Sequence, residues 1–133
     1  MTQRPIDIPS IVNLDRDRLV TYPLDGPEYE SLLRWLPITY DAKTMRGSYY
    51  FQMLPGGVTR PHTHPGYEEF LVLEGTAIES DGRVLNTGDF VTFRPGSHHN
   101  TRTETGCLMI VFEWNNDPAQ LSPATAPTCS EKR

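Results

Sequence analysis

Two histidines and a glutamate stand at spacings that could bring their side chains together. His62 and His64 are separated by one residue, and Glu68 follows four positions later, in the stretch PHTHPGYEEFLVLEG. Successive side chains of a β-strand point to opposite faces, so the two histidines share a face, and Glu68 shares it if the Pro65-Gly66 turn preserves the alternation. Imidazole and carboxylate groups bind several divalent metals, so these residues could begin a metal site.

A further ligand has to come from another part of the chain. The sequence holds four histidines, and the other two are the adjacent His98 and His99. Adjacent residues of an extended chain point opposite ways, so we expect at most one of them to join the site. Glu69 has the opposite parity from Glu68, which predicts a surface or subunit contact for it, with a role as the carboxylate ligand as the alternative.

Short strands are the elements that must position these residues. Twelve prolines and ten glycines divide the chain into segments rich in β-branched and aromatic residues, which favours an all-β sandwich or barrel. Asp81-Gly82 predicts a two-residue hairpin turn of type I′, and we expect two more reversals at 86–88 and 94–96. Strands are predicted at 48–54, 68–73, 75–80, 83–86, 89–93 and 107–114.

The length of 133 residues predicts a single domain. We expect an N-terminal arm with possible edge strands over 1–45, the barrel over 46–114 and a tail over 115–133. Residues 27–40 fit both a helix and a strand, and we favour a strand near 32–40.

Charge and cysteine content exclude several classes of protein. The net charge of −5 and the scattered basic residues predict no binding to nucleic acid or to an anionic membrane. No apolar run approaches the roughly 20 residues of a membrane span. The two cysteines are too few for a disulfide framework, and the N-terminus lacks a secretory pattern, so we expect a cytoplasmic protein. Cys107 is predicted to be a buried small hydrophobic residue, without a disulfide to Cys129.

Two of the predicted strands are apolar on both faces. Phe70 and Val72 are expected to line the barrel near the metal, whereas Leu71 and Leu73 face away. The second apolar face is most simply covered by another subunit or by the N-terminal arm, and a C2 homodimer is the commonest solution.

The strand predicted at 48–54 could also contribute side chains to the interior of the barrel. Tyr50 and Gln52 could look into it by parity with the site, with ordinary packing as the alternative. Tyr49, Phe51 and Met53 are predicted to be core or interface residues.

The stretch from Gly56 resembles the first motif of the cupin superfamily, the RmlC-like barrels. That motif is G-x5-H-x-H-x3-E-x6-G, and this chain matches every specified place. The matching residues are Gly56, His62, His64, Glu68 and Gly75.

The second cupin motif, G-x5-P-x-G-x2-H-x3-N, is similar to the stretch that begins at Gly88. Gly96 and His99 occupy their places, but Arg94 stands where proline is expected and Thr103 replaces the asparagine. The resemblance, which covers roughly residues 46–114, assigns the fourth ligand to His99 and leaves His98 beside the site or exposed. It implies a cupin-type double-stranded β-helix, which is a jelly-roll barrel.

Within the superfamily, the run HTHPGYEEFLVLEG…PGSHH…TGCLMIVFEW looks most like the cupin domain of zinc-binding anti-sigma factors and its stand-alone relatives. Those anti-sigma factors carry a separate helical zinc domain that binds the sigma factor. The first 45 residues of this chain contain no histidine and no cysteine, so we expect no such domain here.

The resemblance implies one divalent metal ion per chain, Fe2+ or Zn2+, with Mn2+ and Ni2+ as alternatives. The ion would be held by His62, His64, Glu68 and His99, leaving positions open for a small-molecule substrate. With iron we expect a dioxygenase acting on a small oxygenated molecule such as a diketone or phenol, with Glu68 as a possible base. With zinc the choices are Lewis-acid chemistry, structural stabilisation or ligand sensing. A metal-dependent enzyme and a non-catalytic zinc-binding sensor or regulatory module are therefore the two hypotheses.

Overall fold

The structure is a computed structural model that describes residues 10–23 and 32–114. Within these ranges the only helical element is a short 3-10 helix, η2 at Arg16–Arg18, and all other regular structure is antiparallel strand. One sheet has the strand order β1-β2-β3-β11-β5-β8, and two smaller sheets have the orders β10-β6-β7 and β4-β9. The bounds are β1 Val20–Thr21, β2 Leu33–Pro37, β3 Gly47–Met53, β4 His62–Thr63, β5 Tyr67–Gly75, β6 Ala77–Glu79, β7 Val84–Leu85, β8 Phe90–Phe93, β9 His98–His99, β10 Thr101–Arg102 and β11 Cys107–Trp114.

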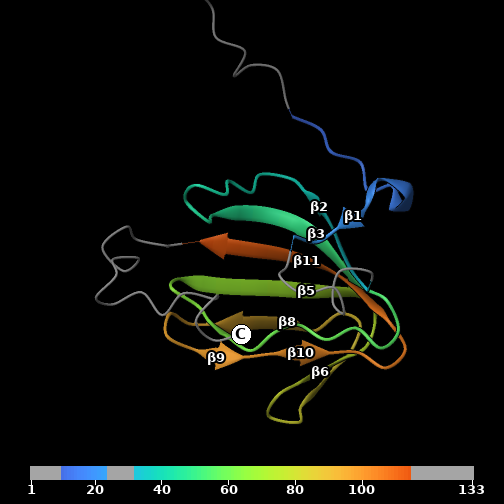
Figure 1. Cartoon of the computed structure of the whole chain (residues 1–133), viewed down its shortest axis with the longest axis vertical. Helices are drawn as coiled ribbons and strands as arrows, with labels where there is room; N and C mark the ends of the chain where they lie inside the picture. The colour runs from blue at the N-terminus through green and yellow to red at the C-terminus, as the bar shows by residue number, and fades with distance from the viewer. Residues whose placement is uncertain (1–9, 24–31, 115–133) are drawn as a thin grey trace, which may run out of the picture.

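The core lies between the large sheet and the smaller ones. Figure 1 shows β3, β11 and β5 side by side across the molecule, with β9, β10 and β6 along one side of them. Both layers contribute buried side chains, because Ala77 of β6 and Leu85 of β7 pack with residues of the large sheet. The core consists of Leu33, Tyr49, Phe51, Met53, Phe70, Val72, Ala77, Leu85, Phe93, Cys107, Met109 and Val111.

Strand β5 shows the alternation that the sequence predicts. Phe70 and Val72 are buried, whereas Leu71 and Leu73 on the other face are only partly buried. Phe70 also lines a cavity of about 360 Å³ inside the barrel, which we call the central cavity. The homodimer expected from the outer apolar face stays a prediction.

The sequence places Tyr50 and Gln52 of β3 among the candidates for the cavity wall, but the other face of this strand lines the cavity. Those two residues do not line the central cavity, whereas Tyr49, Phe51 and Met53 do. The reason is the register: Phe51 lies opposite Met109 of β11, and paired residues share a face of the sheet. The odd or even position of a residue relative to His62 does not predict its face in β3, because His62 belongs to another sheet.

The turn at Asp81-Gly82 also differs from the prediction. Type I′ needs two residues with positive φ, but among the described residues of this turn only Gly82 has one, at 90°. Gly82 N donates to the carbonyl of Glu79 and Glu79 N donates to the carbonyl of Arg83. The connection is therefore a three-residue loop that ends in a glycine with positive φ, as in hairpins whose loop ends in a G1 bulge.

The strands with a clear hydrophobic pattern are confirmed within one to two residues at each end. Residues 33–37 form a strand, which agrees with the choice made for 32–40. Three of the five two-residue strands in the described part of the chain, β4, β9 and β10, are missing from the predicted strands, because their sequences HT, HH and TR carry no apolar alternation. The division into arm, barrel and tail stays a prediction, and the tail at 115–133 lies outside the described residues.

No helix in the described part of the chain has the length and hydropathy that a bilayer crossing requires.

Cys107 is a buried residue at the start of β11, with 6% of its surface exposed. Burial raises the pKa of its thiol to about 11, so little reactive thiolate forms at neutral pH. We expect Cys107 in a Cys129→Ser variant to react with a disulfide reagent such as DTNB only after denaturation. Rapid labelling of the folded variant would contradict the burial of this thiol.

Candidate metal centre

The pairing of β4 with β9 decides which of the adjacent histidines faces inward. His62 lies opposite His99, and Thr63 lies opposite His98. Paired residues share a face, so His62 and His99 point to one side. His98 is exposed on the other side, where its Nδ1 lies 2.8 Å from Thr63 Oγ1, while His99 is 6% exposed.

A β-turn at Arg94–Ser97 ties His64 to the same place. Ser97 N donates to the carbonyl of Arg94 at 3.0 Å, with Pro95-Gly96 at the centre of the turn. His64 N donates to the carbonyl of Ser97, and Gly96 N donates to the carbonyl of His64. These two bonds extend the β4–β9 pairing, so the backbone of His64 is held beside the loop that leads to His99.

The two departures from the second cupin motif keep local hydrogen bonding intact. Pro95, one place later than the motif expects, still opens the turn that precedes His98 and His99. Thr103, in the place of asparagine, is buried; its hydroxyl donates to the carbonyl of Thr76 and accepts from Gly106 N.

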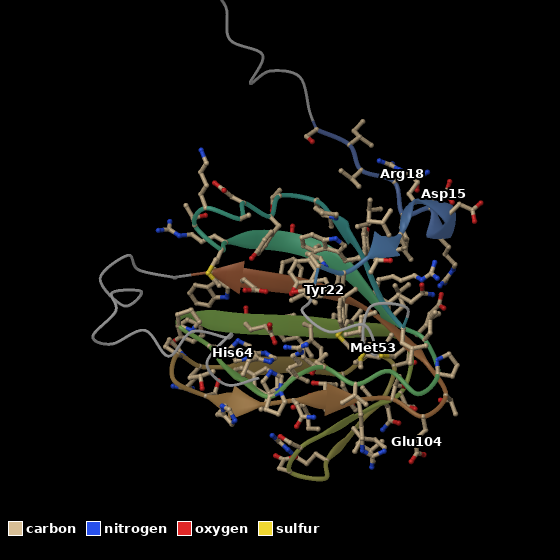
Figure 2. The ribbon with its side chains drawn as sticks, viewed as in Figure 1. Asp15, Arg18, Tyr22, Met53, His64 and Glu104 are labelled. Atoms are coloured by element: carbon tan, nitrogen blue, oxygen red, sulfur yellow. The ribbon has the colours of Figure 1, made fainter. Side chains whose placement is uncertain are left out.

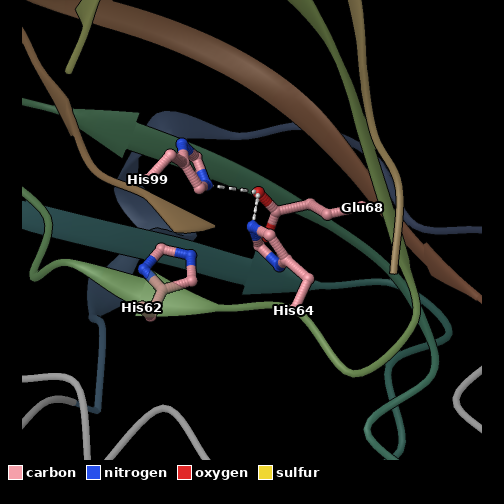
Figure 3. Close-up of side chains that lie close together, drawn as sticks. All are labelled: His62, His64, Glu68 and His99. Carbon is pink, nitrogen blue, oxygen red and sulfur yellow. Dashed lines mark ion pairs between the residues drawn. The ribbon is translucent and has the colours of Figure 1, made fainter. Parts of the chain in front are cut away.

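Glu68, near the start of β5, completes the group. Figure 2 shows His64 below β5, on the side toward β9, and Figure 3 shows the imidazoles of His64 and His99 joined to the Glu68 carboxylate by dashed lines, with His62 beside them. One ligand atom from each of His62, His64, Glu68 and His99 can be chosen so that all lie within 4.8 Å of one another. The structure thus brings together all four residues named from the sequence. We call them the four-residue group.

Two of the imidazoles are oriented by hydrogen bonds on their Nδ1 atoms. His62 Nδ1 lies 2.6 Å from the carbonyl of Arg60, which can only accept, so this nitrogen donates. His99 Nδ1 donates to Glu79 Oε1 at 2.7 Å, and the Thr101 hydroxyl donates to the other oxygen of Glu79. Both histidines therefore keep Nε2 available as a ligand atom.

The Nε2 atoms of His64 and His99 fit a metal better than they fit a hydrogen bond. Both are buried without a hydrogen-bond partner. They lie 3.5 Å and 3.4 Å from Glu68 Oε1. Neighbouring ligands around an ion at about 2.1 Å in a tetrahedral site stand roughly 3.4 Å apart. The residues present therefore fit a divalent ion.

The charges in the group also suit a cation. Burial lowers the pKa of His64 to about 4, so its imidazole is neutral at pH 7. Burial would raise the pKa of Glu68, but the nearby imidazoles of His64 and His99 outweigh it and lower the pKa to about 2. Burial would likewise lower the pKa of His99, but the nearby carboxylates of Glu68 and Glu79 raise it to about 9. A metal would therefore displace a proton from His99 when it binds.

Two further carboxylates belong to the surroundings of the site and were not predicted. Glu79 is 4% exposed and holds His99. Glu113 lines the central cavity, lies opposite Glu68 across the β11–β5 pairing, and accepts from the Tyr49 hydroxyl at 2.7 Å. Burial and the charge of Glu68 raise the pKa of Glu113 to about 8. Each of the two is an acidic residue at an inward-facing position of an otherwise apolar strand. This pattern could have identified both glutamates from the sequence.

Glu69 lies outside the group, as its parity indicates. Its carboxylate accepts from the Thr92 hydroxyl at 2.8 Å and from the Trp114 indole at 2.9 Å. The alternative that Glu69 is the carboxylate ligand is therefore wrong for this structure.

Glu79 is expected to strengthen metal binding by holding the imidazole of His99. Glu79→Gln keeps an acceptor of the same shape but removes its charge, so we expect metal affinity to fall by roughly 10- to 100-fold, as for other residues that support a ligand. Competition with a chelator of known affinity measures the change. Glu104→Gln, on an exposed glutamate, is the matched control, and equal affinities of the two variants would contradict this role.

An antiparallel barrel of this kind is a cupin fold, and its three histidines and one glutamate could hold a metal ion. The chain belongs to the family of the ChrR cupin-like domain, whose model matches residues 27–117. No curated protein matches this sequence.

Solved structures confirm the jelly-roll fold. An acetylacetone dioxygenase from Acinetobacter johnsonii superposes with a TM-score of 0.65 at 14% identity, over 85% of this chain and 79% of that one. The polyketide cyclase RemF from Streptomyces resistomycificus has a TM-score of 0.59 at 18% identity, over 89% and 98%. The complex of Rhodobacter sphaeroides SigE with the anti-sigma ChrR has a TM-score of 0.54 at 18% identity, over 62% of this chain and 44% of the solved one. At these identities the likeness shows the fold alone.

Proposed function

We propose that this chain is a metal-dependent cupin enzyme of the dioxygenase type, which binds one Fe2+ ion and acts on a small oxygenated organic molecule. The single observation that carries the proposal is the position of the four-residue group on the wall of the central cavity. The cavity volume of about 360 Å³ falls at the small end of the range of roughly 300–1,000 Å³ for ligand pockets. The cavity thus offers a place for a small substrate beside the proposed metal.

The residues around the cavity have separate roles in this proposal. His62, His64 and His99 would hold the ion together with Glu68. When bound, iron(II) would supply redox chemistry toward dioxygen, whereas zinc would supply only Lewis-acid chemistry. Glu68 is the candidate base when its carboxylate leaves the ion, because a carboxylate on the cavity wall could then accept a proton from a carbon or hydroxyl of the substrate. The apolar side chains of Phe70 and Val111 also line the cavity and would limit the access of water to a bound substrate.

The atoms and electrons of a dioxygenation balance without a further cofactor. Both atoms of dioxygen end in the organic product, and the substrate supplies the four electrons that reduce them. A diketone or a phenol is electron-rich enough for this role once it has lost a proton. The likeness of the fold to an acetylacetone dioxygenase supports the choice of this class.

The test follows oxygen consumption by protein reconstituted with iron(II) across a panel of diketones and catechols. The proposal expects turnover with at least one member of the panel, and its loss in a His62→Ala variant. Absence of turnover with iron(II) and every compound of the panel, together with tight zinc binding, would contradict the proposal that this chain is an enzyme of this type.

A non-catalytic zinc-binding sensor or regulatory module is the second candidate function. It is favoured by the match to the ChrR cupin-like domain over residues 27–117. In that case the protein purifies with zinc, and ligand binding changes its contacts with a partner protein rather than producing a reaction product. Manganese and nickel remain alternative metals, because histidine and carboxylate ligands suit them as well.

We also infer a cytoplasmic homodimer without nucleic-acid or membrane partners. The partly buried Leu71 and Leu73 on the outer face of β5 support a subunit contact. Sedimentation velocity tests the assembly, and fractionation of cells that produce the protein tests its location.

A further inference from the structure

One wall of the central cavity is built from aromatic side chains. Tyr22 follows β1, Trp35 lies on β2, Tyr40 lies in the β2–β3 connection, and Tyr49 and Phe51 lie on β3. We call these five residues the aromatic wall. Tyr49 and Phe51 are buried in the core, whereas Tyr22, Trp35 and Tyr40 pack against it and are only partly buried. These three therefore keep ring surface that a ligand in the cavity can contact.

The rings of the aromatic wall hold one another in place. Trp35 makes edge-to-face contacts with Tyr22, Tyr40 and Tyr49, at centroid distances of 5.0, 5.5 and 5.3 Å. Tyr22 also meets Phe51 edge to face at 5.1 Å. Edge-to-face pairs at these distances are favourable, so the rings are fixed before a ligand arrives. A preformed wall avoids the entropy loss of ordering side chains upon binding.

The aromatic wall and the four-residue group belong to different parts of the same cavity. Figure 2 shows Tyr22 near β3 and β11, and His64 toward β9. All five residues of the wall precede the two histidine-bearing motifs in the sequence, so the wall is formed by other segments than those that carry the metal ligands. The cavity accordingly has the imidazoles and Glu68 in one part and the ring surface in another, where Glu113 accepts a hydrogen bond from Tyr49 of the aromatic wall.

We propose that the ligand of this cavity is an aromatic molecule with an oxygenated arm, whose ring lies against Tyr22, Trp35 and Tyr40 while the arm reaches the four-residue group. This inference rests on the proposed function and narrows its substrate class from small oxygenated molecules to those that carry an aromatic ring. The cavity volume of about 360 Å³ suits one ring with a short arm.

An aromatic ring gains more from this wall than a saturated ring of the same size. Each ring pair contributes roughly 0.5–1.5 kcal/mol beyond the burial of apolar area, which converts to a factor of about 2 to 13 in affinity. Contacts with two or three rings of the wall are therefore expected to favour the aromatic ligand by about tenfold or more.

The experiment compares 1-phenyl-1,3-butanedione with 1-cyclohexyl-1,3-butanedione, which share the same chelating arm. Calorimetry measures the Kd of each for the full chain loaded with zinc, which does not catalyse reaction with oxygen. We expect the phenyl compound to bind about tenfold more tightly, and Trp35→Leu to reduce this ratio to less than about threefold. Trp114→Leu is the matched control, because Trp114 stacks on Tyr67 and does not line the cavity.

A second variant keeps the proposal testable if Trp35→Leu does not fold. Tyr22→Leu removes a ring from a different segment and should lower the ratio in the same direction, with circular dichroism and zinc content reported for both variants. Equal affinities of the wild-type chain for the two compounds would overturn the aromatic preference while leaving the metal-dependent function intact. If the wild-type chain binds no zinc, the proposed function fails. The ratio of the two Kd values in metal-free protein then decides whether the aromatic wall favours an aromatic ring over a saturated one.

Discussion

Replacing His99 with alanine is expected to lower metal affinity by more than about 100-fold, because it removes a ligand and not merely a residue that supports one. The adjacent His98→Ala should leave metal affinity within about threefold of the wild-type value, as for other exposed substitutions. The two positions differ by one residue in sequence, yet β9 turns His99 inward to the four-residue group and His98 outward to Thr63.

The pair of variants is measured by titration with zinc in the presence of a competing chelator. Metal content after dialysis should remain one ion per chain in His98→Ala and fall close to zero in His99→Ala. The melting temperature of each metal-free variant serves as the control, since it shows whether the fold has survived the substitution. Equal metal loss in both variants would contradict the assignment of His99 as the ligand.

Replacing Gly75 with alanine is expected to destabilise the metal-free protein by roughly 2–5 kcal/mol. Gly75 has a φ of 77°, which costs a residue with a side chain about 1–2 kcal/mol. A Cβ built there would also lie 2.1 Å from the backbone oxygen of Gly106 and 2.9 Å from the Cα of Cys107. Because these are backbone atoms, β5 and β11 would have to separate, and overpacking of this kind adds roughly 1–3 kcal/mol.

Gly82→Ala separates the two causes. Gly82 has a φ of 90°, but a Cβ there would meet nothing within 4 Å, so only the backbone cost of about 1–2 kcal/mol applies. Urea denaturation in the presence of a chelator gives the free energy of unfolding for both variants. A loss in Gly75→Ala no larger than that in Gly82→Ala would show that the close approach of β5 and β11 does not determine the need for glycine.

The sequence predicted the parts of this protein that follow from local patterns. The alternation of β5 identified Phe70 and Val72 as inner residues, and the motif spacing named the four-residue group. The choice of His99 over His98 depended on the resemblance to cupins, and the structure supplies its physical basis in the register of β4 with β9.

The features that were missed depend on pairing between distant segments. Tyr50 and Gln52 face outward because of the register of β3 with β11, which no property of residues 48–54 reveals. Glu79 contacts His99 only because β6 pairs with β10. The aromatic wall likewise assembles from the β1–β3 region, whose segments pair only in the folded chain.

The most direct test of the metal centre is the X-ray absorption spectrum of the zinc-loaded wild-type chain at the zinc edge. We expect one ion per chain, with scattering from three imidazoles and one carboxylate oxygen at about 2.0–2.2 Å. A spectrum with sulfur neighbours, or one without multiple scattering from imidazole, would contradict a site formed by His62, His64, Glu68 and His99.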